Sequence, residues 1–449
     1  MRHKLKYIGL CLLIVLVMLV PACSRKGPIT VASFQDTETA LLAQMVILML
    51  RANGFEVNDD SNRGYVDEVR ELMSYNKVDI YLDYTGSSGE YYFNFVDKEI
   101  WKDAEKGYQT LKELDEKANN FVWLRPAPAN DIWAIAIPRT MAEEKNLWNM
   151  EQFADYVNRG EYIRLAASEA FVTEESALPA YQEVYGFSLR EEQIVTVPGD
   201  NSWDTEKKAA VSSDGVNAAM AYGTDGYLES LNLVILEDTK GAQIVLSPAP
   251  VVRGALLEKY PDIEGILAPV FASLDDETLR SLNSRTGFVG GEVNYLVARD
   301  YLFKKEFLTE DPSGLPTTLP TFTADLPDPE GRSKEILNVM MVVGPNSLVE
   351  RSFTVDQNEE RNARVVGWFM ASGGALNDIR VLVLNDIDFF NWKNLHTVQG
   401  LYKTDKLTTD KIDVSIGAPG TYHLVFDNRF SQFAHKYILA KVYLYWSDK

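Results

Sequence analysis

The chain has 449 residues, 46% of them hydrophobic and 24% charged, and its formal net charge is −21. A single hydrophobic core rarely grows beyond about 250–300 residues, so this length predicts two or three domains. Such an acidic chain repels phosphate backbones, which argues against nucleic acid as a partner and favours small cations.

The first 22 residues have the pattern of an export signal. Basic residues come first, followed by an apolar run from Ile8 to Val20 and the sequence Val-Pro-Ala before Cys23. The run is shorter than the about 18–20 residues of a membrane-spanning helix, and the sequence before Cys23 resembles the lipobox of bacterial lipoproteins. We therefore expect removal of residues 1–22, a lipid on Cys23 and a tether over residues 23–28. An uncleaved anchor and an ordinary signal peptide are the alternatives.

Strand and helix patterns alternate in the next part of the chain. The strand ITVASF precedes a helix over 37–53, which is followed by the strand FEVNDD, the helix YVDEVRELMSYN and the strand VDIYLDY. This β-α-β-α-β order predicts a parallel sheet with helices on both faces. Helices and strands alternate again from about 140 to 235.

Two Pro-Ala-Pro segments, at 126–128 and 248–250, bracket this second block. A block inserted between two such crossings is the connectivity of a two-lobed, hinged α/β protein. We expect lobe 1 over residues 29–130 and 248–308 and lobe 2 over 131–247. Two unrelated turns of similar composition are the alternative.

The composition changes after residue 308. Residues 309–334 are rich in Pro, Thr, Asp and Gly without an apolar period, which predicts a linker. Short segments of period two, separated by Gly, Pro and Asn turns, then predict an all-β antiparallel sandwich over residues 335–449.

Few residues are available for catalysis. The histidines are His3, His396, His423 and His435, none of them in the predicted lobes, and the only cysteine besides Cys23 is Cys11 in the signal. No nucleotide-binding glycine motif follows a strand. We therefore expect no metal site, no cofactor and no enzyme activity. A hydrolase would need a close pair of aspartates around a water.

Aromatic residues at predicted strand ends are a stronger signal. Tyr84, Trp133 and Tyr222 each lie at such an end and have an acidic or amide neighbour. Ligands of α/β sheets bind at the C-terminal ends of strands, so these rings can converge between the lobes. Aromatic faces attract cations, quaternary ammonium groups in particular, by about 1–2 kcal/mol per desolvated contact. The alternative is that each ring packs in a core.

Five segments together resemble the glycine betaine/carnitine/choline-binding proteins of osmoprotectant ABC transporters: VASFQDTETALLAQM, VDIYLDYTGSS, VWLRPAPANDIWAIAI, AYGTDGYLESLNLVILED and SPAPVVRGALLEKYP. The resemblance covers about Ile29 to Leu308. It implies a lipid-anchored receptor with the two-lobed periplasmic-binding-protein fold of type II. Such a receptor closes on a small quaternary ammonium solute and delivers it to a permease and its ATPase. It places ligand-binding residues at Tyr84, Trp133, Tyr222, Ser87 and Asp131, with Trp203 as a further candidate.

Two departures from the family concern positive charges. The chain has Phe34 where the family usually has lysine and Glu174 where it has arginine, and Asp36 adds a negative charge nearby. In betaine binders of the family such cations hold the carboxylate of the ligand. Burying a carboxylate beside Glu174 without a cation would cost free energy, so we expect a choline-like cation more than glycine betaine or carnitine.

The predicted sandwich is not part of the usual binding protein. Its last stretch, GTYHLVFDNRFSQFAHKYILAKVYLYW, is similar to the final strands of Golgi-dynamics (GOLD) sandwiches, and a carbohydrate-binding-like sandwich is the alternative. A GOLD-like domain implies a protein partner or membrane association. A second hypothesis for the whole chain is therefore a binding-protein fold that serves as a cell-surface scaffold, adhesin or sensor. In either case we expect the protein on the periplasmic or cell-surface side of a bacterial membrane.

Overall fold

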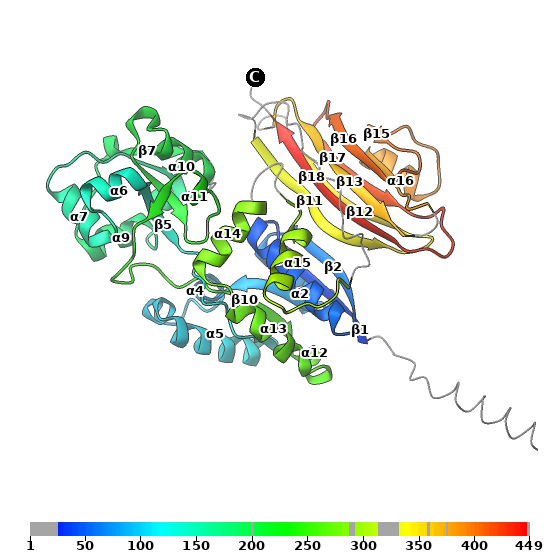
Figure 1. Cartoon of the computed structure of the whole chain (residues 1–449), viewed down its shortest axis with the longest axis horizontal. Coiled ribbons are helices and arrows are strands. Elements are labelled where there is room, and N and C mark those ends of the chain that lie inside the picture. The colour runs from blue at the N-terminus through cyan, green and yellow to red at the C-terminus, as the bar shows by residue number, and fades with distance from the viewer. Residues whose placement is uncertain are drawn as a thin grey trace, which may run out of the picture.

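The computed structural model describes residues 26–198, 202–286, 292–312, 332–356, 360–373 and 376–446. The expected signal and Cys23, and residues 313–331 of the expected linker, lie outside these ranges. Two α/β bodies are followed by all-antiparallel β-sheets (Figure 1), which confirms the predicted fold class. In the part of the chain that is described, no helix has the length and apolar character needed to cross a membrane.

Lobe 1 is the body around a five-stranded sheet of order β2-β1-β3-β10-β4. The first three strands are parallel, and β10, which returns from lobe 2, runs antiparallel to β3 and β4. The elements are β1 (Lys26–Phe34), α2 (Thr37–Ala52), β2 (Phe55–Gly64), α3 (Val66–Ser74), β3 (Ile80–Tyr84), α4 (Thr85–Tyr92), η1 (Lys98–Lys102), α5 (Ala104–Asn119), β4 (Phe121–Trp123), β10 (Pro248–Arg253), α12 (Gly254–Lys259), α13 (Asp262–Ala272), α14 (Asp276–Thr286) and α15 (Asn294–Lys304).

Lobe 2 is the body around a second five-stranded sheet, of order β7-β6-β8-β5-β9. Here β5 is the strand that runs antiparallel to both of its neighbours, β8 and β9. The elements are β5 (Trp133–Pro138), α6 (Arg139–Lys145), α7 (Met150–Asn158), β6 (Leu165–Ser168), α8 (Glu169–Thr173), α9 (Leu178–Tyr185), η2 (Glu191–Gln193), β7 (Ile194–Val197), α10 (Ser202–Ala210), η3 (Ser213–Gly215), β8 (Ala218–Tyr222), α11 (Tyr227–Ser230) and β9 (Leu233–Ile235).

The two chain segments that connect the lobes lie side by side. The Ala127 amide of the first Pro-Ala-Pro segment donates to the Pro248 carbonyl of the second, at 2.9 Å. Closer to lobe 2, the Asp131 amide donates to the Leu246 carbonyl at 3.0 Å, and the Leu246 amide donates to the Asn130 side chain at 2.8 Å. Adjacent, hydrogen-bonded crossings of this kind can act as a hinge.

The C-terminal part of the chain forms two four-stranded antiparallel sheets, of order β11-β18-β13-β16 and β12-β17-β14-β15. The elements are β11 (Arg332–Val343), β12 (Leu348–Val355), β13 (Arg364–Ser372), β14 (Arg380–Asn385), α16 (Asp386–Lys393), β15 (Tyr402–Lys403), β16 (Thr409–Ser415), β17 (Gly420–Asp427) and β18 (Lys436–Trp446). We call this body the sandwich. Its first sheet faces α2, α15 and β2 of lobe 1 (Figure 1).

Strand β18 is buried on both of its faces. Ile438 and Ala440 belong to the core between the two sheets, whereas Leu439 points the other way and packs with Met340 and Met370 into the core of lobe 1. Successive residues of a strand point to opposite faces, so one strand can serve two cores. The sandwich and lobe 1 therefore share a hydrophobic core.

Hydrogen bonds also cross this contact. Asn294 of α15 and Asn338 of β11 exchange two hydrogen bonds of 3.0 Å. Lys441 is 2% exposed and donates from Nζ to the carbonyls of Glu292, at 2.9 Å, and Thr286, at 3.3 Å. Burial lowers the pKa of Lys441 to about 8, although the nearby Glu335 carboxyl acts against this. The contact thus has the buried, hydrogen-bonded character of a domain core.

Candidate functional site

The three predicted aromatic residues lie at strand ends near the crossings. Tyr84 is the last residue of β3 in lobe 1, Trp133 is the first of β5, and Tyr222 is the last of β8. Trp133 and Tyr222 are direct partners in the antiparallel β5-β8 pair, and Trp133 also packs edge-on against Phe171, with 6.0 Å between ring centroids. All three predicted rings are half-buried. The structure thus brings two of them together in lobe 2.

Glu38, in the first turn of α2, connects the third ring to lobe 2. Its carboxyl group accepts hydrogen bonds from the Tyr84 hydroxyl at 2.9 Å and from Asn283 Nδ2 of α14 at 2.7 Å, and it lies 2.6 Å from the Thr224 hydroxyl of lobe 2. Burial, and to a smaller extent the nearby Asp131 carboxylate, raise the pKa of Glu38 to about 8. A neutral carboxylic acid is therefore the main form of Glu38 at pH 7.

The Thr224 hydroxyl lies between two carboxyl groups. Its oxygen is 2.6 Å from Glu38 and 2.7 Å from Asp131, and the Thr224 amide donates to the same Asp131 oxygen at 3.3 Å. A hydroxyl has one proton and can donate to only one of them. The other short contact requires a proton on a carboxyl group, in agreement with the raised pKa of Glu38. The site therefore holds one shared proton between the lobes.

Asp131 has the same kind of environment as Glu38. Burial raises the pKa of Asp131 to about 6, and the negative charges of Asp225 and Asp36 add to this effect, against the hydrogen bonds from Thr224. Among the residues that the structure describes, no Lys or Arg side chain forms an ion pair with Glu38 or any of these three aspartates. Arg280 lies near the loop after β8, but its Nη1 donates to the Gly223 carbonyl at 2.7 Å.

The residues near the end of β1 have structural partners. Asp36 is the N-cap of α2: it accepts a hydrogen bond of 2.8 Å from the Thr39 amide and another from the Thr39 hydroxyl, while burial raises the pKa of Asp36. Phe34 lies against Tyr81, with 6.1 Å between ring centroids. Asp36 is therefore held in a fixed position in the helix cap, close enough to the site to raise the pKa of Asp131.

The structure places three other predicted residues as follows. Ser87 is exposed on α4, whereas its neighbour Ser88 is buried and donates to Asp83 at 2.7 Å. Glu174 is exposed at the C-cap of α8. Trp203 belongs to α10, but its side chain lies outside the described part of the structure. These positions leave Glu38, Asp131 and the three rings as the core of the candidate site.

Two glycines allow the loop after β8 to approach lobe 1. A Cβ atom at Gly223 would lie 2.1 Å from the Asn130 carbonyl oxygen, and one at Gly226 would lie 2.3 Å from the Ser284 amide nitrogen of α14. Any other residue would force the backbones apart. Thr224 lies between the two glycines in the sequence. Their close packing therefore allows Thr224 to contact Glu38.

Sequence reasoning missed Glu38, Thr224 and Asn283. Thr224 lies in the AYGTDG segment, which pointed to the site through Tyr222 only. An acidic residue in the first turn of a helix is ordinary, because it interacts favourably with the helix dipole. The sequence around Glu38 therefore indicates only the start of a helix. No sequence signal connects it to Asn283, which is 245 residues away.

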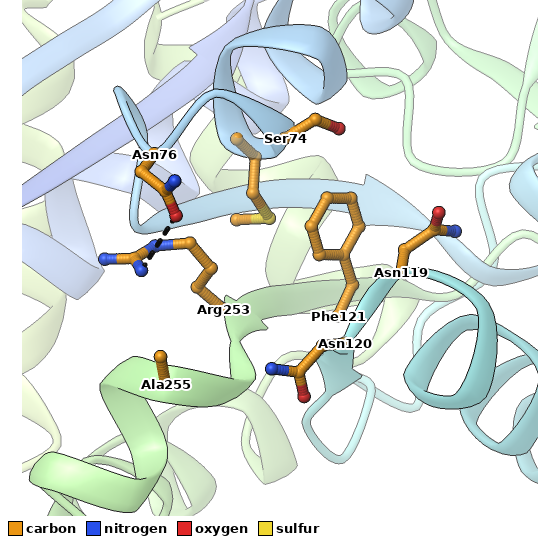
Figure 2. Close-up of a pocket in the computed structure, with 8 residues that line it drawn as sticks. Ser74, Asn76, Asn119, Asn120, Phe121, Arg253 and Ala255 are labelled. Carbon is orange, nitrogen blue, oxygen red and sulfur yellow. Dashed lines mark hydrogen bonds between the residues drawn. The ribbon is translucent and has the colours of Figure 1, made fainter.

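A cavity of about 230 Å³ lies elsewhere in lobe 1 and is shown in Figure 2. Its lining comes from the end of α3, the end of α5, the start of β4 and the turn from β10 into α12, remote from Tyr84 at the other end of β3. The charged residue in the lining is Arg253, which donates to Asn76 at 3.1 Å and forms an ion pair with Asp79. This cavity has no feature suited to a cation. In the described residues no group of three or more His, Cys, Asp or Glu side chains could hold a metal ion either.

The chain is similar to known transport proteins over its first two thirds. A family described as the substrate binding domain of ABC-type glycine betaine transport systems matches residues 27–304. The glycine betaine-binding protein YehZ of Escherichia coli (strain K12) is 40% identical over 279 residues, which are 62% of this chain and 91% of YehZ. A glycine-betaine-binding protein of Pseudomonas aeruginosa is 27% identical over 284 residues, 62% of this chain and 88% of that protein.

Solved structures agree with this relationship. Apo YehZ from Escherichia coli matches with a TM-score of 0.58 at 40% identity, covering 63% of this chain and 100% of that one. A glycine betaine/carnitine/choline ABC transporter structure matches with a TM-score of 0.55 at 14% identity, covering 62% and 99%, and shares the fold. The sandwich lies outside the family match, which ends at residue 304. Residues 27–304 therefore make this chain a member of the family of substrate-binding domains of ABC-type glycine betaine transport systems.

Proposed function

We propose that this protein is a lipid-anchored, extracytoplasmic receptor that binds a small quaternary ammonium cation, choline-like more than betaine-like, and delivers it to an ABC permease. The observation that carries the proposal is the contact of Glu38 and Asp131 with one Thr224 hydroxyl, beside Tyr84, Trp133 and Tyr222. Family membership gives the transport role. The contact of Glu38 and Asp131 with Thr224 supports a positive charge on the ligand.

The shared proton between Glu38 and Asp131 stands in for a positive charge. Two buried carboxyl groups without a cationic partner are costly when both are ionised, so the free receptor retains a proton. A bound cation would remove that cost and allow Glu38 to ionise. Its methyl groups would lie against the aromatic faces, which attract quaternary ammonium groups. Binding of the cation would therefore be coupled to release of the shared proton.

The same charges disfavour a ligand with a carboxylate. The two related binding proteins are named for glycine betaine, which carries such a group. This chain has Phe34 and Glu174 at positions where the family usually has lysine and arginine, and Asp36 is fixed nearby as a helix cap. A carboxylate placed among Asp36, Glu38 and Asp131 would meet the negative charge of Asp131 in a desolvated site, where neither Lys nor Arg forms an ion pair with these three described residues. A ligand with an alcohol in place of the carboxylate avoids this.

The other parts of the proposal concern location and partners. Lipidation at Cys23 would hold the receptor at the membrane, and closure about the adjacent Ala127 and Leu246 segments would present the loaded lobes to the permease. The family match favours this role over that of a scaffold, adhesin or sensor. The GOLD-like assignment of the sandwich and a protein partner for it stay predictions.

The test is calorimetry on the mature chain from Ser24 onward, with the sandwich present. Choline, glycine betaine and carnitine are titrated at pH 7.5, and Trp133→Ala is compared with Trp148→Ala, a partly exposed tryptophan of lobe 2. We expect choline to bind more tightly than betaine, and Trp133→Ala to weaken choline by about tenfold, the equivalent of one cation–π contact. Tighter binding of betaine would overturn the ligand preference. No binding of any of the three would overturn the proposed function.

A further inference from the structure

The sandwich contacts the lobe 1 half of the candidate site at the start of α2. Gln35 is the residue before Asp36, the N-cap of α2. The side-chain amide of Gln35 donates to the backbone carbonyl of Glu335 in β11 at 3.3 Å, and its backbone amide donates to the Gly64 carbonyl of β2 at 2.8 Å. The segment that leads into Glu38 is therefore held by the sandwich on one side and by β2 on the other.

The side chain of Glu335 extends this contact to the ends of two strands. One carboxyl oxygen accepts a hydrogen bond from Asn62 Nδ2 of β2 at 3.4 Å, and the other accepts one from Asn338 Nδ2 of β11 at 2.9 Å. The Asn62 backbone amide in turn donates to Ser33 Oγ of β1 at 2.8 Å. Glu335 thus connects β11 to the ends of β1 and β2, directly before the start of α2.

The sandwich also holds the end of α14. Lys441 of β18 donates from Nζ to the carbonyl of Thr286, the last residue of α14, at 3.3 Å. The carbonyls of the last helical turn have no partner within the helix, so a cation is a favourable partner for them. Asn283 lies in this turn and donates to Glu38 at 2.7 Å and to the Thr224 carbonyl at 3.0 Å. Lys441 therefore fixes the helix end from which Asn283 contacts Glu38.

Packing in the core does not by itself determine this contact. Leu279 and Leu282 pack α14 into the same hydrophobic core as α2. Apolar contacts are non-directional, whereas hydrogen bonds have preferred distances and angles. Glu38 and Asn283 are 245 residues apart in the sequence, so the 2.7 Å bond between their side chains depends on how the ends of the two helices are held. The hydrogen bonds from the sandwich act at these two ends.

We propose that the sandwich is a positioning domain of the ligand site, in which Glu335 holds the start of α2 and Lys441 holds the end of α14, so that Asn283 meets Glu38. Glu335 and Lys441 are positioning residues and do not touch the ligand. The inference rests on the proposed function, because Glu38 is the group that would ionise when the cation binds. It gives the added domain a role in ligand affinity.

The first experiment is calorimetry with choline at pH 7.5 on the mature chain from Ser24 onward. Wild type is compared with Lys441→Met, Gln35→Ala and the structural control Leu439→Ala, which removes a buried side chain from the shared core at the same interface. We expect Lys441→Met to weaken choline about tenfold and Gln35→Ala about threefold, as the loss of one charged and one neutral hydrogen bond. Leu439→Ala should lower the melting temperature and leave the affinity for choline unchanged.

The second experiment needs no ligand and uses Gln35→Ala, which removes no titratable group. Tyr84 donates to Glu38, and burial together with the Asp131 charge raises the pKa of Glu38 to about 8, so its contribution to stability is lost as the pH rises through 8. A Glu38 side chain that is no longer held against Asn283 is better hydrated, and its pKa falls. The free energy of unfolding should then decrease less between pH 5 and 9 than in wild type. Leu439→Ala should lower it by the same amount at every pH.

The outcomes separate this inference from the proposed function. Wild-type affinity for choline in Lys441→Met, or an equal loss of affinity in Leu439→Ala, would overturn the inference, since the sandwich would then contribute stability only. If Lys441→Met does not fold, Gln35→Ala decides by both measurements. If wild type does not bind choline, the proposed function is wrong, and the second experiment still tests the positioning. A wild-type pH dependence in Gln35→Ala would overturn it.

Discussion

Glu38→Gln should make the stability of the free protein less dependent on pH. Glutamine has the shape of glutamate: its amide oxygen can accept hydrogen bonds from Asn283 and from the Thr224 hydroxyl, which contact the same oxygen of Glu38, and its amide nitrogen can donate to the Tyr84 hydroxyl. It cannot ionise. The variant therefore keeps the geometry of the site and removes the titration of one group.

The magnitude follows from the pKa of Glu38 in the folded and unfolded states. A rise of the pKa from 4.5 to about 8 means that, between pH 4.5 and pH 8, Glu38 holds a proton in the native state and has released it in the unfolded state. This contribution to stability is fully present below pH 4.5 and is lost as the pH rises through 8. The full difference corresponds to about 5 kcal/mol, at about 1.4 kcal/mol for each pH unit.

The measurement is urea unfolding, followed by tryptophan fluorescence, at pH values from 5 to 9. Wild type, Glu38→Gln and Glu113→Gln, an exposed control in α5, are compared. Between pH 5 and 9 we expect the free energy of unfolding of wild type to fall by several kcal/mol more than that of Glu38→Gln. The fall for Glu113→Gln should equal that of wild type. Asp131 and other buried acids contribute to the pH dependence of both wild type and Glu38→Gln. The difference between the two free energies of unfolding therefore measures the contribution of Glu38. A difference that stays constant with pH would refute the shared-proton argument.

Three further predictions concern the contacts around the site and the sandwich. Lys441→Met should lower the free energy of unfolding by about 3–5 kcal/mol, because Glu335 loses the buried positive charge near it. The control Lys117→Met, at an exposed position, should change the free energy of unfolding little. Equal effects of the two substitutions in urea unfolding would contradict this prediction. Gly226→Ala should lower the melting temperature, since its Cβ would meet the α14 backbone, while Gly265→Ala in α13, with open space around it, should raise it by relieving about 1 kcal/mol of helix cost. A rise for both would show that the loop can adjust. Choline binding at pH 7 should release up to one proton, seen as a binding heat that varies with the ionisation enthalpy of the buffer, and buffer-independent heats would exclude the exchange.

The sequence supported those features that depend on local patterns. The position of Tyr84, Trp133 and Tyr222 at strand ends could be predicted from the alternating pattern, whereas their role in ligand binding stays a prediction. The order of strands and helices likewise predicted two lobes and an all-β domain. These inferences need only the period of the hydrophobic pattern and the positions of its interruptions.

The acidic centre of the site could not be predicted in this way. Glu38 is buried because Asn283 and Thr224, from distant parts of the chain, close over it. The aromatic residues after Tyr84 show the same limit: Phe93 is buried, whereas Tyr91 is 64% and Phe95 74% exposed. Neighbouring residues of one type thus differ in burial because tertiary contacts decide which of them are covered.

The shared core of lobe 1 and the sandwich bears on how this receptor can be dissected or evolve. The family match ends at residue 304, before the sandwich. Here Met340 and Leu439 complete the core that contains α2, the helix whose first turn carries Glu38. A truncation after α15 would expose this apolar face to water and promote aggregation. The sandwich is therefore part of the hydrophobic core of lobe 1, and a variant without it would need polar substitutions on the helices that it covers.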